Sequence, residues 1–183
     1  MFLSLVRKRR SIRKFSEGEI EPSKIDTLIE AALRSPSSRG LNPWQFVVVR
    51  KPELLERLSK AKSHGSAFLK EARLGLVVCA NPGESDVWIE DCSIASTIIL
   101  LAAESLGLGS CWIQIRERMH DDWMSAEEYV AETLGIPKTV RVTSIIAIGY
   151  PGEEKEPHKK DELEYEKVFL NAYGNEYRGV KSS

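Results

Sequence analysis

The residues best suited to chemistry stand near the start of the chain, in the stretch RKRRSIRKF from Arg7 to Phe15. Six of its nine residues are cationic, although the formal net charge of the chain is only −1. Ser11 and Ile12 interrupt the run, which is unusual for a plain basic tail. Arginine forks, a hydroxyl and backbone N–H groups are the donors that a phosphate needs. The stretch therefore indicates a phosphate site, with a solvated face, a localisation signal or a nucleic-acid patch as the alternatives.

Other motifs that carry chemistry are missing from the sequence. There is no GxxxxGK[ST] loop, no GxGxxG after a strand and no GxSxG elbow. His64, His120 and His158 lack the spacing of metal ligands, and no carboxylate stands in an apolar setting that would mark an acid–base pair. We therefore expect no catalytic side chain and no metal. If the protein is an enzyme, a cofactor carries its chemistry.

Length and composition describe one globular domain, residues 1–183, with 42% hydrophobic and 29% charged residues. The 26 Lys and Arg residues balance 27 Asp and Glu residues, so no basic field is left to hold nucleic acid. Cys79, Cys92 and Cys111 stand in apolar contexts, which is typical of small buried side chains in a reducing, cytoplasmic compartment. No signal peptide is visible, and the apolar run 98–103 is too short to span a membrane.

An alternation of helices and strands must position these residues. Apolar residues from 25 to 33 at helical spacing predict an amphipathic helix, with Ser23 as its N-cap and Pro22 before it. Residues 36–44 form a loop by composition. Further helices are expected over 52–61, 87–106 and 125–135. Buried strands are expected over 45–50 and 74–80, and two further strands over 108–113 and 140–151.

Three of these segments carry more specific signals. The second half of helix 87–106 is apolar nearly all round, which predicts burial on more than one side, at the centre of the fold or at a subunit interface. Ser125 and Glu128 form a capping box, and Gly135 is placed as the C-cap of the same helix. The tail 160–179 is expected to form a helix and then an extended arm. The whole pattern indicates an α+β or α/β fold with one sheet.

Four segments, in order, resemble the FMN-dependent nitroreductase family and cover nearly the whole chain. They are RRSIRKF, SPSSRGLNPWQFVVV, IEDCSIASTIILLAAESLGLGSCWI, and IAIGYP with the later HKK. The resemblance implies an α/β/α sandwich with a mainly antiparallel sheet flanked by helices. It also implies a homodimer that exchanges the C-terminal arm, about residues 160–183, and has two flavin sites at its interface.

The same resemblance assigns site residues. Those that would hold the FMN phosphate, the ribityl chain and the N1–C2=O edge of the ring are Arg9, Arg10, Ser11 and Arg13. Those that match the C-terminal phosphate ligands are Lys159 and Lys160. Those that would reach the partner's flavin are Pro36, Ser37, Ser38 and Arg39. The resemblance places backbone atoms near N5 and O4 of the flavin ring in three residues, Trp112, Ile113 and Gln114. For Trp112, a plain core aromatic is the alternative.

The chain departs from the family pattern near its predicted site. The usual loop asparagine falls on Gly40 and the usual glutamine on Asn42, so Asn42 is the candidate to remake the contact with the ring edge. The stretch before helix 87–106 is short, so a lid-like insertion is not expected. The acidic C-terminal segment departs from the usual basic pattern, and no segment marks a preference for NADH or NADPH.

The activity that the resemblance implies is NAD(P)H-dependent reduction by a ping-pong reaction. NADH or NADPH delivers a hydride to flavin N5 and leaves, and an electron-poor small molecule then takes the electrons. Nitroaromatics, quinones and free flavins are such acceptors. The alternatives are an FMN store or sensor without turnover, and a flavin-destroying or dehalogenating member of the superfamily. A small nucleic-acid-binding protein is a more distant alternative.

Overall fold

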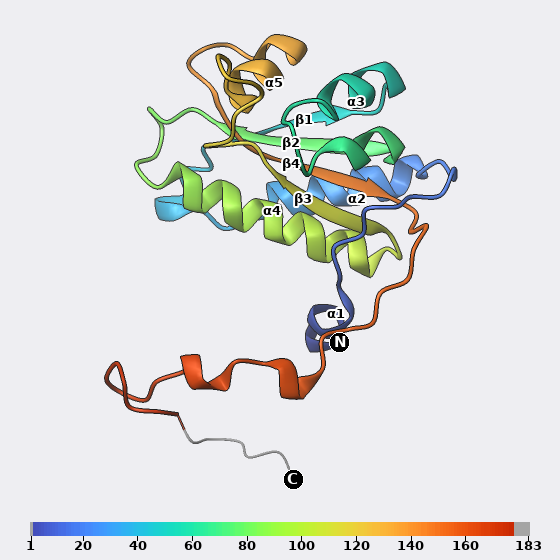
Figure 1. The fold of residues 1–183 in the computed structure, drawn as a ribbon. Coiled ribbons are helices and arrows are strands. Elements are labelled where there is room, and N and C mark those ends of the chain that lie inside the picture. The colour runs from blue at the N-terminus through green and yellow to red at the C-terminus, as the bar shows by residue number, and fades with distance from the viewer. Residues whose placement is uncertain (1, 178–183) are drawn as a thin grey trace.

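The computed structural model describes residues 2–177 and has an antiparallel sheet at its centre (Figure 1). Its strands lie in the order β1-β2-β4-β3, and every neighbouring pair is antiparallel. The central strands β2 and β4 are almost wholly buried because apolar residues cover both of their faces. The strands are β1 (Trp44–Val49), β2 (Leu74–Ala80), β3 (Gly109–Gln114) and β4 (Arg141–Gly149).

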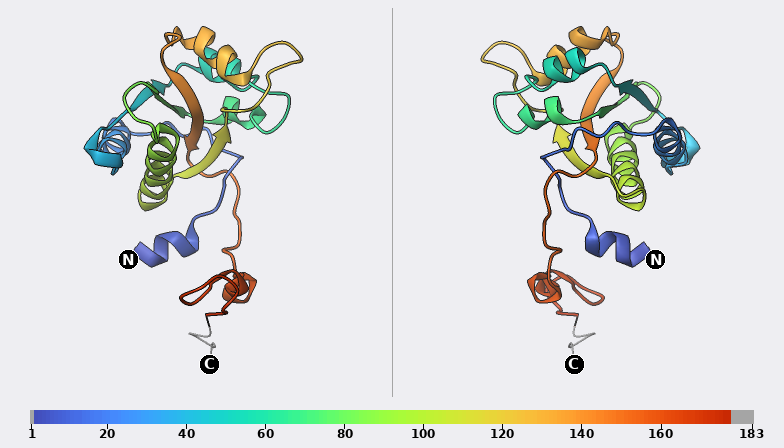
Figure 2. Two further views of the ribbon diagram at one scale, coloured as in Figure 1. Left: turned by 90° about the vertical axis from the view of Figure 1, so that its left-hand side faces the viewer. Right: turned by 90° about the vertical axis from the view of Figure 1, so that its right-hand side faces the viewer.

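Helices cover both faces of the sheet (Figure 2). Successive strand residues point to opposite faces, so Leu76 and Ile146 pack under α2 and α4, while Val77 and Ile145 pack under α3 and α5. This arrangement confirms the predicted α/β/α sandwich. The helices are α1 (Phe2–Lys8), α2 (Pro22–Leu33), α3 (Pro52–Leu58), α4 (Trp88–Ser105) and α5 (Ala126–Leu134).

Two predicted details of these elements are wrong. The N-cap of α2 is Glu21, not Ser23, because Pro22 itself takes the first helical position. Proline suits that position, since its φ is preset and its missing N–H would have no helical partner there. The strand expected to be buried over 45–50 is an edge strand, and Gln45 and Val48 of β1 are exposed.

Within residues 2–177, much of the outer face of α4 is left uncovered, although α1 contacts the helix near its C-terminal end. Cys92, Ala95 and Ile99 face the core, whereas Ile94 is 40% exposed. Within the fold, α4 is therefore buried on one side only, whereas its composition predicts burial on more than one side. Among residues 2–177, no helix has the length and apolar character needed to cross a membrane.

Both ends of the described chain extend away from the body (Figures 1 and 2). The sequence did not predict α1, whose Lys8 Nζ lies 3.6 Å from Glu104 Oε1 of α4. The helix expected from residue 160 is wrong: the tail forms only the short 3₁₀ helices η3 (Lys160–Glu162) and η4 (Tyr165–Lys167). Its apolar side chains are about half exposed, and a weakly amphipathic segment is marginal without a packed face. Residues 178–183 of the expected arm lie outside the described residues.

The caps predicted for α5 are both present. The Glu128 N–H donates to Ser125 Oγ at 3.1 Å, the Ser125 N–H donates to the Glu128 carboxylate at 2.8 Å, and Gly135 ends the helix with a φ of 68°. Ser125→Ala removes one acceptor, so we expect it to lower the free energy of unfolding by about 1 kcal/mol in urea. Ser23→Ala is the control, because that side chain makes no cap hydrogen bond. Equal losses in both variants would contradict the capping role.

Candidate functional site

The basic motif lies along the outer edge of β3. Ser11 pairs with Ser110 in a short parallel bridge, and the Ile12 N–H donates to the Ser110 carbonyl at 3.0 Å. Gly109 permits this approach, because a Cβ there would lie only 2.8 Å from the Ile12 side chain. Backbone contacts therefore hold the motif on the sheet, and its arginine side chains are not needed for that purpose.

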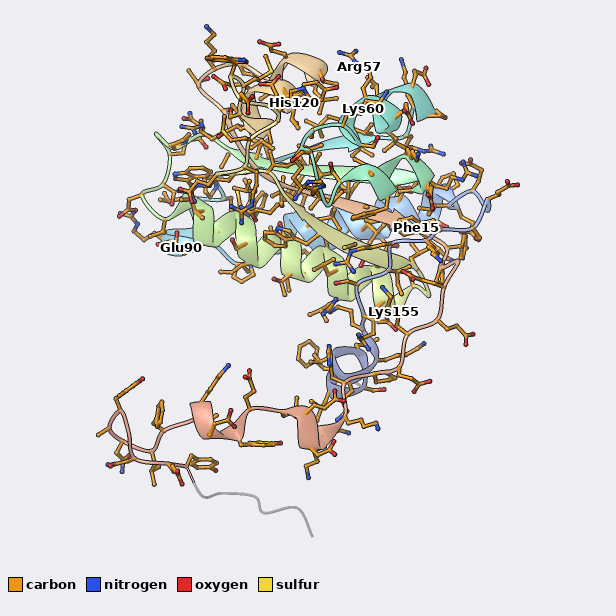
Figure 3. The ribbon with its side chains drawn as sticks, viewed as in Figure 1. Phe15, Arg57, Lys60, Glu90, His120 and Lys155 are labelled. Carbon is orange, nitrogen blue, oxygen red and sulfur yellow. The ribbon has the colours of Figure 1, made fainter. Side chains whose placement is uncertain are left out.

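Residues 152–155, which follow β4, also contact the motif. The Lys155 ammonium donates to the Ser11 carbonyl at 2.7 Å. Glu153 Oε1 accepts the Arg13 N–H at 2.6 Å and lies 3.1 Å from Lys155 Nζ. The Gly152 N–H donates to the Lys14 carbonyl at 2.8 Å. The segments before α2 and after β4 thus meet here, and Lys155 adds its charge to the cations of the motif. Figure 3 shows Lys155 near Phe15, the last residue of the motif.

The charge of this cluster is positive and largely uncompensated. The Arg13 N–H, and then Lys155, hold the pKa of the Glu153 carboxyl below its usual range, so Glu153 offsets one positive charge. Burial raises the pKa of the Cys111 thiol on β3, while Arg13, Lys155 and Arg9 act in the opposite direction. These cations therefore lie within electrostatic reach of one point on β3. In the part of the chain that the structure describes, no carboxylate forms an ion pair with the side chains of Arg9, Arg10 or Arg13.

Hollows flank the cluster. One, of about 690 Å³, is lined by Arg13, Phe15, Phe68 and Lys155 among others, and the Arg13 guanidinium lies 5.8 Å from the centre of the Phe68 ring. Another, of about 380 Å³, is lined by Arg10 and Lys155, but four carboxylates line it too, those of Glu104, Glu153, Glu154 and Glu156. Of the predicted residues, Arg10 and Arg13 thus line open space, and the hollow of Arg13 is the one better suited to an anionic ligand.

The second predicted group lies in one loop at the start of α4. Ser37 and Asn42 bond each other: Ser37 Oγ lies 2.7 Å from Asn42 Oδ1 and accepts the Asn42 N–H at 2.9 Å. The Ser38 N–H donates to Asp91 Oδ1 at 2.8 Å, and Arg39 pairs with Asp86. These contacts hold Ser37, Ser38, Arg39 and Asn42 on the N-terminal end of the helix, and Pro36 belongs to the same loop.

Asp91, which anchors this loop, is a carboxylate that the sequence did not single out. It is only 1% exposed and also accepts the Ser85 hydroxyl at 3.1 Å. Its partners are a backbone N–H and a hydroxyl, so Asp91 holds the loop in place and does not form an acid–base pair. Its position in the first turn of α4 is electrostatically favourable, because unpaired N–H groups point at that end of a helix.

The two groups of site residues lie at opposite ends of α4. Lys8 beside the motif meets Glu104 in the last turn, whereas Ser38 meets Asp91 in the first turn. Figure 3 shows the same separation between Lys155 and Glu90. A helix of 18 residues is roughly 27 Å long, so the two groups of one chain do not surround one flavin.

Two of the three predicted residues on β3, Trp112 and Gln114, present backbone to the free edge of the sheet, whereas the backbone of Ile113 faces β4. The Ser110 carbonyl points outward to Ile12, and backbone groups alternate along an antiparallel strand, so those of Trp112 and Gln114 face the same edge. The Trp112 indole N–H donates to Gln114 Oε1 at 3.0 Å. Ile113 is fully buried, with its side chain in the core under α5. Trp112 is also a core residue, half-buried on the α4 side.

Lys159 and Lys160 lie further along the tail, at the start of η3, where the Lys159 N–H donates to Glu162 at 3.2 Å. Lys155 is the lysine of this segment that reaches the motif. Sequence reasoning missed it, although it belongs to the same small basic group.

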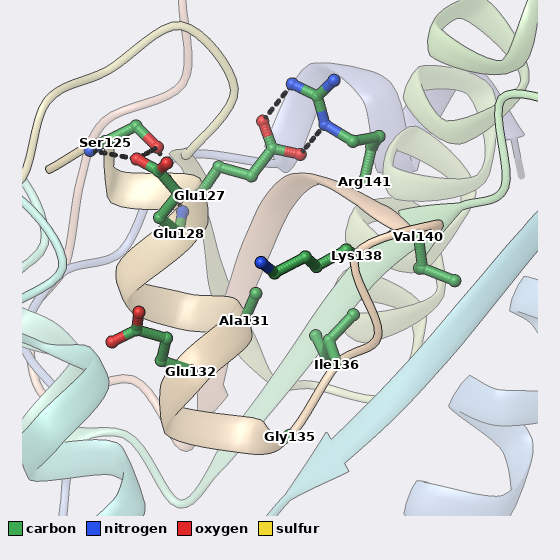
Figure 4. Close-up of a pocket in the computed structure, with 10 residues that line it drawn as sticks. All are labelled: Ser125, Glu127, Glu128, Ala131, Glu132, Gly135, Ile136, Lys138, Val140 and Arg141. Atoms are coloured by element: carbon green, nitrogen blue, oxygen red, sulfur yellow. Dashed lines mark hydrogen bonds and ion pairs between the residues drawn. The ribbon is translucent and has the colours of Figure 1, made fainter.

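A separate hollow of about 740 Å³ lies beside α5 (Figure 4). Its main charges are already paired: Arg141 bonds Glu127 through Nε at 2.5 Å and Nη2 at 2.7 Å, and Glu128 caps the helix. It therefore lacks the uncompensated charge of the motif. Within residues 2–177, no group of three or more His, Cys, Asp or Glu side chains is arranged to hold a metal ion.

Comparison with known proteins identifies the family. A model of the nitroreductase family matches residues 6–73 and 62–150. The chain belongs to the nitroreductase family. An FMN-dependent nitroreductase from Clostridium difficile has a similar structure, with a TM-score of 0.92, 46% identity, and coverage of 93% of this chain and 99% of that one.

Curated relatives of this nitroreductase-family chain have names that also describe oxidoreductases using NADH or NADPH. A protein of Archaeoglobus fulgidus, provisionally named NADH dehydrogenase/NAD(P)H nitroreductase, is 39% identical over an alignment of 164 positions that covers 87% of this chain and 91% of the relative. The FMN reductase (NAD(P)H) of Bacillus subtilis is 25% identical over an alignment of 187 positions that covers 88% of this chain and 72% of the relative.

Proposed function

We propose that the protein is an FMN-dependent NAD(P)H oxidoreductase that reduces electron-poor small molecules such as nitroaromatics, quinones and free flavins. The observation that carries this proposal is the cluster of Arg9, Arg10, Arg13 and Lys155 at the edge of β3. The names of the relatives support the same cofactor and reductant.

The cluster fits a phosphomonoester, which carries nearly two negative charges at neutral pH. Three arginines and a lysine supply the positive charge, and Glu153 removes only part of it. Arginine also offers paired donors in the geometry of phosphate oxygens. We assign Arg9, Arg10 and Ser11 to the phosphate and ribityl chain, and Arg13 to the N1–C2=O edge of the ring.

FMN, when bound, supplies the redox chemistry by taking a hydride from NADH or NADPH and passing the electrons to the second substrate. The protein positions the reactants. The free edge of β3 offers the backbone groups of Trp112 and Gln114 to the ring, and the Arg13 cation favours negative charge near N1. Proximity of this kind contributes roughly 7–11 kcal/mol to a two-reactant step.

We further propose a homodimer with flavin sites at its interface. The loop of Ser37, Ser38 and Asn42 lies one helix length from the cations of its own chain, so it serves the flavin of the partner. The uncovered face of α4 and the half-exposed apolar side chains of the tail supply surface for the contact. Lys159 and Lys160 would then reach a phosphate through the exchanged arm.

The short connection between β2 and α4 supports an open substrate face. It spans residues 81–87 and forms a turn without a helix, so no lid lies there. We propose cytoplasmic action, where the buried free thiols of Cys79, Cys92 and Cys111 stay reduced.

We expect the purified protein to show a flavin absorbance spectrum that bleaches on anaerobic addition of NADH or NADPH. Once the nicotinamide product is removed, a quinone should restore the colour, because ping-pong turnover separates the two half-reactions. A flavin spectrum that no nicotinamide cofactor bleaches would favour a store or sensor. A colourless protein that does not bind added FMN would overturn the proposal.

A further inference from the structure

A second cationic hollow lies next to the proposed flavin site. It measures about 390 Å³, and we call it the lysine hollow after Lys60, Lys62 and Lys70, which line it with His120. Its only lining carboxylate within the described chain, Glu56, is 3.1 Å from Lys60 Nζ. Lys62 and Lys70 have no ion-pair partner among residues 2–177. The hollow therefore holds two uncompensated positive charges, which an anionic ligand would neutralise.

Lys62 is the partly buried lysine of the hollow. Its Nζ lies over Gly65, 3.6 Å from the position that a Cβ would take there. Burial, and then the nearby Arg118, lower the pKa of the Lys62 ammonium. A half-buried ammonium beside another cation is unfavourable unless an anion binds against it.

His120 forms a fixed wall of the hollow. Its ring stacks on Tyr129, with the ring centres 4.0 Å apart and the planes at 18°. Its Nδ1 lies 2.8 Å from the Lys60 carbonyl, which can only accept, so Nδ1 carries the proton. Figure 3 shows Lys60 and His120 side by side. The His120 ring is thus held in place by contacts within the chain.

The lysine hollow adjoins the hollow of Arg13 and Lys155. Ala67 lines both, and Gly65, under the Lys62 ammonium, lines the second. The two hollows are therefore neighbours with a shared wall at Ala67, which suits a ligand with its reacting end at the flavin and an anionic portion further out. A nicotinamide dinucleotide has this form, because its reacting ring and its phosphates are at different positions along the molecule.

We infer that the lysine hollow binds phosphate groups of the nicotinamide dinucleotide that reduces the flavin. This inference rests on the proposed function. Lys62 and Lys70 would hold a phosphate anion in either of two cases. The phosphate belongs either to the pyrophosphate, which NADH and NADPH share, or to the 2′-phosphate, which NADPH alone carries.

The kinetic test compares reductants that carry the same ring. Reduced nicotinamide riboside has the reacting ring and no phosphate. In the holoenzyme variant Lys62→Gln/Lys70→Gln, we expect the ratio of kcat/KM for NADH to that for the riboside to fall about tenfold, since each lost contact is charge-assisted. Lys138→Gln, which removes one positive charge beside α5, is the control and should leave the ratio unchanged. A fall for NADPH without a fall for NADH assigns the hollow to the 2′-phosphate.

If the ratio in the double variant stays at the wild-type value for both dinucleotides, the inference is overturned. Loss of bound FMN from the single variant Lys62→Gln would also overturn it, because Lys62 would then belong to the flavin site. A second measurement needs no turnover. Titration calorimetry of inorganic pyrophosphate into the oxidised holoprotein should show binding that the double variant loses. If neither NADH nor NADPH bleaches the flavin but pyrophosphate binds at the lysines, the proposed function is wrong and the anion site stands without its assigned ligand.

Discussion

Arg13→Ala releases most of the FMN from the protein and leaves the chain folded. The Arg13 guanidinium faces the hollow that it shares with Lys155 and makes no ion pair within residues 2–177. A charge-assisted contact contributes about 1.5–3 kcal/mol, so we expect the Kd for FMN to rise about 10- to 100-fold. Arg9→Ala is expected to act in the same direction.

The fold should survive because the contacts that fix the motif belong to its backbone. Glu153 accepts the Arg13 N–H, and Ile12 donates its N–H to Ser110, neither of which the substitution removes. We therefore expect the free energy of unfolding of the apoprotein to change by less than about 0.5 kcal/mol. It must be measured without FMN, since a ligand that binds the folded state adds stability of its own.

The measurement is the ratio of flavin to protein absorbance after dialysis, followed by FMN titration of the apoprotein. Arg50→Ala removes an exposed arginine next to β1 and serves as the control for charge alone. If Arg13→Ala keeps the full flavin absorbance of the wild type, the phosphate and ring-edge assignment of the motif is incorrect.

The central elements could be predicted because local patterns in the sequence determine them. The apolar run LGLVVCA corresponds to β2 residue for residue, since a strand buried on both faces needs apolar side chains at every position. The capping box of α5 involves residues three apart and was equally visible. The strand order was not visible in this way and came only from the resemblance to the family.

The missed parts of the site depend on contacts between distant residues. Lys155 bonds Ser11 across 144 positions of sequence, and Asp91 bonds Ser38 across 53. No periodicity encodes such an approach, and a lysine among acidic neighbours or an aspartate at a helix start looks like an ordinary surface residue. The burial of Asp91 follows from the loop of residues 35–43 folding over the start of α4, which is a tertiary contact.

Asp91→Ala is expected to have the largest effect on stability of the changes considered. The substitution leaves the Ser38 N–H and the Ser85 hydroxyl without their acceptor in a site that is 1% exposed. Each unsatisfied buried donor costs about 1–3 kcal/mol, so we expect the free energy of unfolding to fall by about 2–4 kcal/mol. Asp91→Asn keeps an oxygen for the Ser38 N–H and should lose less than half as much.

Urea unfolding of the apoprotein measures this effect, and Glu90→Ala provides a matched control. Glu90 is the neighbouring carboxylate in the same turn of α4, but it is exposed (Figure 3). Its removal should change the free energy of unfolding by less than about 0.5 kcal/mol. Similar losses for Asp91→Ala and Glu90→Ala would show that the buried carboxylate does not hold the loop.

The two main substitutions separate binding from positioning. Arg13→Ala removes a group that touches FMN in the proposed site, so it weakens FMN binding without loss of apoprotein stability. Asp91 acts through the loop and Ser85 and does not touch FMN, so Asp91→Ala should weaken FMN binding and apoprotein stability together. The carboxamide of Asp91→Asn should restore most of both. In the proposed dimer, each flavin site combines the cations of one chain with the loop of the other. In a mixed dimer of one Arg13→Ala chain and one Asp91→Ala chain, both substitutions should therefore affect the same flavin site and leave the other site intact. Loss of FMN from both sites of that mixed dimer would place the loop against the flavin of its own chain.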